Sequence, residues 1–353
     1  MLSIQNISKD LGEFLLDDIS LTIGEGEYFV IIGPTGAGKT ILLETIAGIY
    51  PPDAGSVAIG GRDVTFAPPR ERNVTMVYQD YMLFPHLTVE QNIGFGLEYR
   101  KVPPEERTAK VQEVAEIFGI GHLLHRYPET LSGGEQQRAA ISRAIVLEPA
   151  VLLLDEPLSA LDGQTRERLR HELRKLHARY RTTIIHITHN FDEVFSLASR
   201  VAVMNKGRVV QTGTPEDVFR HPESSFVAQF VGVQNIFSGT CTTEDALSRI
   251  SVPRPDSTDA LFCSLTPHPG ETATVTIRPE DIMIGRDTCT TSARNSFEGT
   301  VTDIVDNGMV VAVHVDAGLP FIAYVSRQGW AAVGAAVGDT VHLTIMADAV
   351  HVF

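Results

Sequence analysis

The stretch GPTGAGKT, residues 33–40, has the residue types and spacing of a phosphate-binding loop. The apolar run 28–32 precedes it and a segment with helical periodicity, 39–47, follows it, which is the strand, loop and helix context that such a loop requires. Its glycines let successive N–H groups and the helix N-terminus converge on one anion. The predicted nucleotide-binding residues are Gly33, Pro34, Thr35, Gly36, Ala37, Gly38, Lys39 and Thr40.

Two side chains of this loop and two acids later in the chain could act on a nucleoside triphosphate. Lys39 would reach the β- and γ-phosphates, and the Thr40 hydroxyl would bind Mg²⁺. Asp155 and Glu156 close the apolar run 151–154, and the end of such a strand points at the nucleotide. Asp155 suits Mg²⁺ coordination, usually through water, and Glu156 can accept a proton from an attacking water molecule. The alternative is a pair of acids that only caps a strand.

The segment LSGGEQQR, residues 131–138, lies between these two motifs. Ser132 and Glu135 have the spacing of a capping box, and Gly133 and Gly134 leave the helix N-terminus open to a close-approaching group. Capping alone would explain Ser132 in isolation. The position of the segment, after a phosphate loop and shortly before an acidic strand end, favours a functional role.

In this order the motifs resemble those of the ATPase subunits of ATP-binding-cassette transporters, over residues 1 to about 230. The resemblance implies that the nucleotide is ATP, that the metal is Mg²⁺, and that two copies pair head to tail as a homodimer. The signature motif of one copy would then close over the nucleotide on Lys39 of the other, and Asp162 in SALD would lie in the dimer-interface loop. The signature residues are Ser132, Gly133, Gly134 and Glu135.

The resemblance also assigns side chains outside these motifs. Gln79 would sense Mg²⁺ and the attacking water, and His189 would contact the γ-phosphate. The family stacks adenine on an aromatic side chain of the first hairpin, where this sequence has Leu11 at the expected position and Phe14 three residues later, so Phe14 is the predicted contact. The predicted catalytic residues are Glu156, His189 and Gln79, and the predicted Mg²⁺ ligands are Thr40, Gln79 and Asp155.

Buried strands that alternate with amphipathic helices must position these motifs. VLLLDEP at 151–157 and TTIIHITH at 182–189 are continuous apolar runs, and the helical segment between them has leucines on one face. The pattern predicts an α/β fold over residues 1–231, a P-loop NTPase cassette with a parallel core sheet covered on both faces. The resemblance places a helical subdomain at about 84–148. His186 alternates into the sheet and is expected to be a core residue.

Residues 232–353 have a different texture, with short runs rich in Val, Thr, Gly and Ala separated by turn signals. Such a pattern is typical of an all-β domain, here predicted to be an OB-like barrel. NIFSGTCT at 235–242 matches NSFEGTVT at 295–302 in five of eight positions, which indicates two similar halves unless so short a match arises by chance.

This tail has no lysine, and it holds fourteen acids and six arginines. A dianion would therefore need a concentrated donor site, and Arg294 supplies a fixed charge with forked donors. The segment TSARNSFEGTV resembles the small oxyanion-binding module of molybdate and tungstate proteins, over residues 291–353. Related modules use a lysine where this sequence has Met346, and a solvated surface charge is the alternative for Arg294. The predicted oxyanion-binding residues are Ser292, Ala293, Arg294 and Asn295.

The resemblance implies ATP-driven import of molybdate or tungstate through integral-membrane permease subunits, with an extracytoplasmic oxyanion-binding protein as an indirect partner. Feedback inhibition by anion bound to the tail is expected as well. Because IRPEDI at 277–282 also resembles importers of sugars and polyamines, those substrates and sulfate stay open. A non-transport relative is disfavoured, since only 92 residues separate Lys39 from Ser132, too few for an inserted coiled coil. Residues 79–97 are expected to form the groove that receives a permease helix, and the alternative is that their apolar side chains belong to the core of the helical subdomain.

Bulk properties narrow the possible partners and the location. The formal charge of −15 argues against nucleic-acid binding, because a phosphate-tracking surface needs clustered Lys and Arg. No apolar run is long enough to span a membrane, and the N-terminus lacks a signal-peptide pattern, so the chain is expected neither to span a membrane nor to be exported. The resemblance implies a peripheral subunit on the cytoplasmic face of the cell membrane. Cys241, Cys263 and Cys289 lack metal-ligand spacing and are expected to be packing residues.

Overall fold

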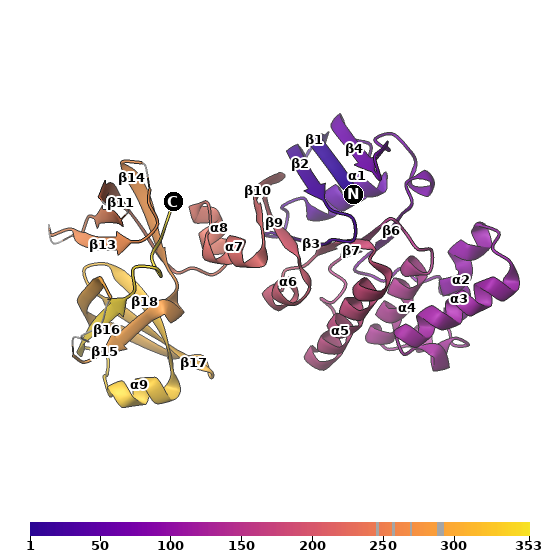
Figure 1. Ribbon diagram of the computed structural model, residues 1–353. Helices are drawn as coiled ribbons and strands as arrows, with labels where there is room; N and C mark the ends of the chain where they lie inside the picture. Colours follow the sequence, from indigo (N-terminus) through magenta and orange to yellow (C-terminus); the bar gives the residue numbers. More distant parts are fainter. Residues whose placement is uncertain (245–246, 256–257, 269, 288–292) are drawn as a thin grey trace. The chain divides into compact units, whose positions relative to one another are not determined.

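The computed structural model describes the chain except residues 245–246, 256–257, 269 and 288–292 (Figure 1). The chain forms two compact units, Met1–Pro215 and Glu216–Phe353. Among the described residues, no helix combines the length and the apolar composition that crossing a membrane requires.

The first unit is built on a six-stranded sheet in which five neighbouring strands are parallel and one edge strand is antiparallel. Every residue of its three central strands is buried, which explains why their sequences are continuous apolar runs rather than alternating patterns. The predicted parallel core sheet is thus confirmed. In spatial order the strands are β10 (Arg208–Gly213), β9 (Arg200–Asn205), β3 (Tyr28–Ile32), β8 (Thr183–Ile187), β7 (Val151–Asp155) and β6 (Val74–Val77).

A second, antiparallel sheet of this unit shares a core with the first one. Helix α1 (Lys39–Ala47) contributes Leu42, Leu43 and Ile46 to an apolar cluster that contains residues of both sheets. The helix that follows the phosphate loop is therefore fixed by packing against both sheets. The strands of the second sheet are, in spatial order, β2 (Leu15–Ile23), β1 (Leu2–Asp10), β4 (Ala54–Ile59) and β5 (Arg62–Asp63).

The remaining helices of the unit have clear start signals and buried faces. Thr88 and Gln91 form a capping box at the start of α2, and Ser132 and Glu135 form the one at the start of α4. Three helices, α2, α3 and α4, pack on one another between β6 and β7 in the sequence. The helices are α2 (Val89–Tyr99), α3 (Pro104–Ile117), α4 (Gly133–Ile145), α5 (Gly163–Tyr180) and α6 (Phe191–Leu197), with 3₁₀ turns at Pro69–Glu71, Gly121–Leu123 and Pro128–Thr130.

The second unit begins with two short helices, α7 (Pro215–Arg220) and α8 (Ser225–Phe230), and continues as strands. The sequence places the domain boundary after these helices, whereas the compact unit begins before most of α7. The reason is contact with the strands: Arg278 donates a hydrogen bond to the carbonyl of Phe219, and the imidazole of His351 lies 3.0 Å from the carbonyl oxygen of Pro222.

Two five-stranded antiparallel sheets enclose one core in this unit. Four phenylalanine rings lie at its centre, with ring centroids 4.9–6.2 Å apart. One sheet has the order β13 (Ala260–Ser264), β12 (Leu247–Val252), β11 (Asn235–Glu244), β14 (Thr272–Ile277) and β20 (His351–Val352). The other has the order β18 (Pro320–Ser326), β17 (Val310–Asp316), β16 (Asn295–Asp306), β19 (Thr340–Ile345) and β15 (Ile282–Gly285), with the 3₁₀ turn Pro279–Asp281 before β15 and α9 (Arg327–Val333) after β18.

The two sheets repeat one arrangement, which confirms the internal repeat. Asn235 pairs with Ile277 across β11 and β14, and Asn295 pairs with Ile345 across β16 and β19 in the same register. The last strand of each half, however, completes the sheet of the other half: β15 pairs with β19, and β20 pairs with β14. The halves are therefore intertwined rather than side by side.

Candidate functional site

The phosphate loop connects β3 to α1 with a backbone that only glycine adopts easily. Gly33, Gly36 and Gly38 have φ angles of 156°, 79° and 93°. A Cβ atom at Gly33 would collide with the carbonyl oxygen of Met204, and one at Gly38 would collide with the ring of Phe14. The backbone conformation thus favours glycine at all three positions, and close neighbours also require it at Gly33 and Gly38.

The Lys39 ammonium group lies inside the curve of this loop. It donates hydrogen bonds to the carbonyl oxygens of Gly33, at 2.8 Å, and Pro34, at 2.9 Å. Burial lowers the pKa of Lys39, and the carboxylates of Glu156 and Asp155 raise it. The loop therefore holds the Lys39 ammonium group close to the carboxylates of Glu156 and Asp155.

Oxygen donors suited to a divalent cation meet next to the loop. The Thr40 hydroxyl donates a hydrogen bond to Oδ2 of Asp155 at 2.9 Å. Burial raises the pKa of Asp155, and the hydrogen bond from Thr40 lowers it. A hydroxyl and a carboxylate at this distance fit Mg²⁺, which prefers hard oxygen ligands. Gln79 is exposed in the turn after β6, and β6 neighbours the strand of Asp155, so both lie at the carboxyl edge of the sheet.

The structure brings Glu156 and His189 together, although they are far apart in sequence. The Nδ1 atom of His189 lies 3.3 Å from Oε2 of Glu156. The strands β7 and β8 that end before these residues are parallel neighbours, and the N–H of Glu156 donates to the carbonyl of Ile187 at 3.0 Å. Glu156 has a φ of 46°, which turns the chain sharply after β7. A carboxylate and an imidazole thus face the edge where the phosphate loop lies.

The signature segment LSGGEQQR starts α4 through side-chain hydrogen bonds. The Ser132 N–H and hydroxyl donate to Oε2 of Glu135 at 2.7 and 2.8 Å, and these bonds lower the pKa of Glu135. Ser132 and Gly133 are exposed, whereas Gly134 is buried and a Cβ atom there would come 2.6 Å from Cγ2 of Thr165. Gly134 therefore permits close approach of α4 and α5 within one chain, a role that its sequence context did not indicate.

The loop that is predicted to lie at a dimer interface ends in a helix cap. Oδ1 of the exposed Asp162 accepts hydrogen bonds from the N–H groups of Gln164 and Thr165 at 3.1 and 3.0 Å. Hydrogen bonds from the side chain and the N–H group of Thr165 lower the pKa of Asp162. Arg166, which was not predicted, donates to the carbonyls of Leu158 and Leu161 at 3.3 and 2.7 Å. An arginine on a helix carries no motif signal, so only the structure identifies it as a support of this loop.

The aromatic side chain of the first hairpin reaches the phosphate loop. Phe14 is half-buried and its ring lies over Gly38, while Leu11 is exposed. The sequence also did not predict a hydrogen-bonded pair near Asp155, in which Tyr78 donates to Oε1 of Glu44 at 3.3 Å. Burial and the charge of Glu44 raise the pKa of Tyr78 to about 12.

In the tail, the four predicted oxyanion residues have different surroundings. Ser292 lies outside the described residues, Ala293 is half-buried and Arg294 is exposed. Asn295 is buried, and its side chain bonds to the backbone: it accepts from the N–H of Cys263 at 2.6 Å and donates to the carbonyls of Cys263 and Ile345 at 3.0 and 3.3 Å. Asn235 makes the corresponding bonds in the other half, to Ile277 and Ile322.

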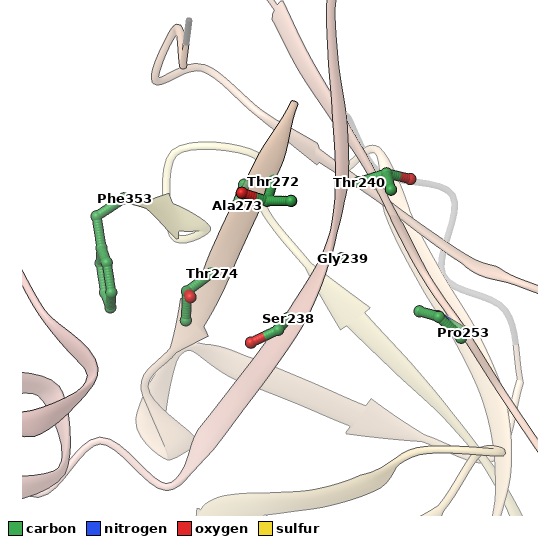
Figure 2. A pocket seen from close by; sticks show the side chains of 8 residues that line it. All are labelled: Ser238, Gly239, Thr240, Pro253, Thr272, Ala273, Thr274 and Phe353. Carbon is green, nitrogen blue, oxygen red and sulfur yellow. The ribbon is translucent and has the colours of Figure 1, made fainter. Parts of the chain in front are cut away.

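A surface hollow of about 530 Å³ lies elsewhere in this unit, along the outer face of β11 and β14 (Figure 2). Its lining has hydroxyl groups but no charged side chain, so it offers an anion no cationic donor. The lining residues are Ser238, Gly239, Thr240, Pro253, Thr272, Ala273, Thr274 and Phe353.

A parallel sheet with a glycine-rich phosphate loop after one strand and acids at the end of another defines a P-loop nucleoside triphosphatase. Residues 16–159 match the family model of the ABC transporter, and residues 275–353 match that of the TOBE domain. The chain is 44% identical to the molybdate/tungstate import ATP-binding protein of Pyrococcus horikoshii over 100% of both chains. It is 45% identical to the protein of that description from Thermococcus kodakarensis, over 85% of this chain and 88% of the relative.

A solved structure of a dimeric ATP-binding cassette in a post-hydrolysis state, bound to ADP and Pi, is also similar. It superposes with a TM-score of 0.56 at 29% identity, over 61% of this chain and 99% of that chain. The chain belongs to the family of ABC transporter ATPases.

Proposed function

We propose that the chain hydrolyses MgATP as a homodimer, on the cytoplasmic face of the membrane, and that hydrolysis powers import of molybdate or tungstate through permease subunits. The observation that carries the catalytic part is the pair Glu156 and His189, 3.3 Å apart at the sheet edge that holds the phosphate loop. The substrate follows from the two relatives described as molybdate/tungstate import ATP-binding proteins, which the chain matches over most or all of its length.

Each side chain of this site has a distinct task. The N–H groups of the loop and the Lys39 ammonium group bind the phosphates, and Phe14 contacts the adenine. Thr40, Asp155 and Gln79 hold Mg²⁺, which when bound supplies positive charge to the phosphate oxygens. Glu156 accepts the proton of the attacking water, and His189 donates a hydrogen bond toward the γ-phosphate.

The homodimer completes the site. Ser132 and Gly133 are exposed in a single chain, so this end of α4 is accessible to the nucleotide of a second copy. Asp162 is exposed as well and lies in the loop expected to cross the interface. A structural relative described as dimeric supports this assembly.

The permease would dock on the segment after Gln79. Tyr81 and Met82 have φ angles of 61° and 45°, and the side chain of Met82 is 56% exposed. The ring of Phe84 packs on that of Phe95 at 4.6 Å, and Arg143 lies over Phe84 at 5.2 Å while donating to the carbonyl of Met82 at 2.8 Å. A partly apolar surface beside Gln79 can couple a membrane helix to the site.

For the tail, the proposal is that Arg294 binds the transported oxyanion and reports its cytoplasmic concentration to the ATPase. Arg294 is exposed and supplies the charge, and Ser292, Ala293 and backbone N–H groups complete the site. Asn295 contributes by holding β13 against β16 and β19 through its backbone bonds. An extracytoplasmic binding protein would deliver the anion to the permease and is an indirect partner.

The test of the proposed function is Glu156→Gln in the full-length chain. The variant keeps the shape of the side chain but removes the base, so MgATP binding should persist while hydrolysis falls by roughly 10²–10⁴-fold. Binding is measured by calorimetry and hydrolysis by phosphate release, at several protein concentrations because activity should rise with dimer formation. Near-normal hydrolysis by the variant would remove Glu156 from this role.

A further inference from the structure

The turn that carries His189 is supported by a buried polar cluster behind it. The cluster consists of Tyr28 on β3, His186 on β8, Thr188 after β8, and Glu193 on α6. These side chains are 1%, 0%, 3% and 2% exposed, so water does not solvate them. Buried polar groups are costly unless they bond to one another, which makes their arrangement informative.

Glu193 is tied to both neighbours of His189. The Thr188 hydroxyl donates a hydrogen bond to Oε2 of Glu193 at 2.6 Å, and the same hydroxyl accepts one from the N–H of Asn190 at 3.0 Å. The Asn190 side chain in turn accepts from the N–H groups of Asp192 and Glu193 at 2.8 and 3.4 Å. The backbone on each side of His189 is therefore anchored to the start of α6.

A neutral histidine, His186, lies near the same carboxylate oxygen of Glu193 that Thr188 contacts. The Nδ1 atom of His186 lies 2.9 Å from the Tyr28 hydroxyl, and its Nε2 atom lies 3.4 Å from Oε2 of Glu193. Burial lowers the pKa of His186 to about 3 and raises that of Tyr28, so the imidazole is neutral and the phenol keeps its proton. If the phenol donates to Nδ1, the ring proton lies on Nε2 and faces Glu193.

Positive charges on α5 also act on Glu193. Burial raises the pKa of Glu193, whereas the hydrogen bond from Thr188 and the charges of Arg166 and Arg170 lower it. Arg166 holds the loop that ends at Asp162 through the carbonyls of Leu158 and Leu161. Glu193 thus lies between the turn of His189 and the helix that supports the dimer-interface loop.

We propose that Thr188 and Glu193 are positioning residues, which lock the turn around His189 so that its imidazole stays beside Glu156. The proposal rests on the proposed function and extends it to residues away from the nucleotide. The His189 side chain is 64% exposed, so little packing restrains it, and its position depends on the backbone that carries it. Small displacements of a reacting group cost large factors in rate.

The test compares Thr188→Val with Thr188→Ser in the full-length chain. Valine keeps the shape of threonine and removes the hydroxyl, while serine keeps the hydroxyl and removes a methyl group. We expect Thr188→Val to lower kcat for MgATP hydrolysis by roughly 10- to 100-fold with a change in KM of less than about threefold, because the phosphate loop is untouched. Thr188→Ser should stay within about threefold of the parent.

A double-variant comparison shows whether Thr188 acts through His189. If it does, Thr188→Val combined with His189→Ala should be no slower than His189→Ala alone, since the group to be positioned is already gone. Glu193→Gln, which keeps the side-chain shape but removes the charge, should likewise slow the parent and leave the His189→Ala variant unchanged. Thermal unfolding of each variant verifies that the chain is folded.

Three outcomes would overturn the proposal. They are a normal kcat for Thr188→Val, an equal loss in Thr188→Val and Thr188→Ser, and losses that multiply with His189→Ala. A parent chain that does not hydrolyse MgATP would overturn the proposed function and this inference with it. An active parent with an equally active Thr188→Val variant overturns the positioning role alone.

Discussion

At the level of single residues, two adjacent residues of the predicted oxyanion motif, Arg294 and Asn295, have different surroundings. Asn295 is enclosed by backbone partners on β13 and β19, whereas Arg294 is exposed. Only the arginine can supply the charge that a tetrahedral dianion needs in a unit with so many acids.

Substitution of Arg294 tests this assignment. Calorimetric titration of the full-length chain with molybdate, tungstate and sulfate should show binding of at least one anion, and Arg294→Ala should weaken it by roughly 10-fold or more, as expected for the loss of a charged donor. Arg327→Ala is the matched control, since it also removes an exposed arginine of the same unit, one that pairs with Asp306 at 2.8 Å. Equal affinity in the parent and Arg294→Ala would return Arg294 to the role of a surface charge. Absence of binding for all three anions would favour a sugar or polyamine substrate.

Residues that belong to spaced motifs could be recognised from the sequence, because phosphate binding demands glycine, lysine and a hydroxyl at fixed intervals. The roles of Thr188, Glu193 and Arg166 could not be recognised from the sequence. Their partners are brought in by the folding of β3, β8, α5 and α6, and a threonine or glutamate near a strand end has many ordinary explanations. Asn295 was predicted from the sequence only as an oxyanion-binding residue, and its bonds to the backbone were not foreseen, because a short polar side chain can bind a ligand or the backbone.

At the level of helices and strands, the close approach of α4 and α5 depends on the glycine at position 134, which has no side chain. A Cβ atom at position 134 would come 2.6 Å from Cγ2 of Thr165, whereas one at position 133 would lie 3.6 Å from the Tyr81 hydroxyl, an ordinary contact. A contact this short puts the cost of overpacking in the upper part of its usual range of about 1–3 kcal/mol. After the gain of at most about 1 kcal/mol from replacing glycine by alanine in a helix, Gly134→Ala should lower the free energy of unfolding by about 1–2 kcal/mol.

Urea unfolding of four variants checks the direction. Gly133→Ala should be neutral or slightly stabilising. Thr165→Ser removes the obstructing methyl group, so Gly134→Ala combined with Thr165→Ser should recover most of the loss relative to Thr165→Ser alone. A Gly134→Ala chain as stable as the parent would contradict the close contact between these helices.

In the second unit, the sequence reveals the strands themselves but not how all of them pair. Alternating runs such as those of β11 and β16 identified strands and their similarity, because their core positions repeat with a period of two. The exchange of β15 and β20 between the halves could not be inferred, since both are short and their partners lie outside their own repeat. Pairing between distant segments is decided by the shared core, not by local pattern.

At the scale of the whole molecule, the exchange makes the second unit depend on the last residues of the sequence. Val352 is buried and pairs with Val275, and Phe353 exchanges two backbone hydrogen bonds with Thr274, at 2.8 and 3.2 Å. Deletion of residues 351–353 should therefore lower the stability of this unit by about 2 kcal/mol, the value of one buried valine, or more.

Calorimetric unfolding measures that loss, and MgATP binding is the internal control because every predicted nucleotide residue lies in Met1–Pro215. Binding should be unchanged while the transition of the second unit moves to lower temperature. Unchanged unfolding of the shortened chain would mean that β20 contributes nothing to the sheet.

The pairing of β14 with β20 also limits when the second unit can fold during translation. Val275 of β14 cannot meet Val352 until the ribosome has added 77 more residues, which takes about 4–15 s at ordinary rates of translation. During that interval, the edge of β14 that will pair with β20 has unpaired backbone N–H and C=O groups. The first unit, Met1–Pro215, has already left the ribosome by then and can fold. On a polysome, several incomplete chains expose this edge of β14 close to one another, so pairing between chains is favoured there.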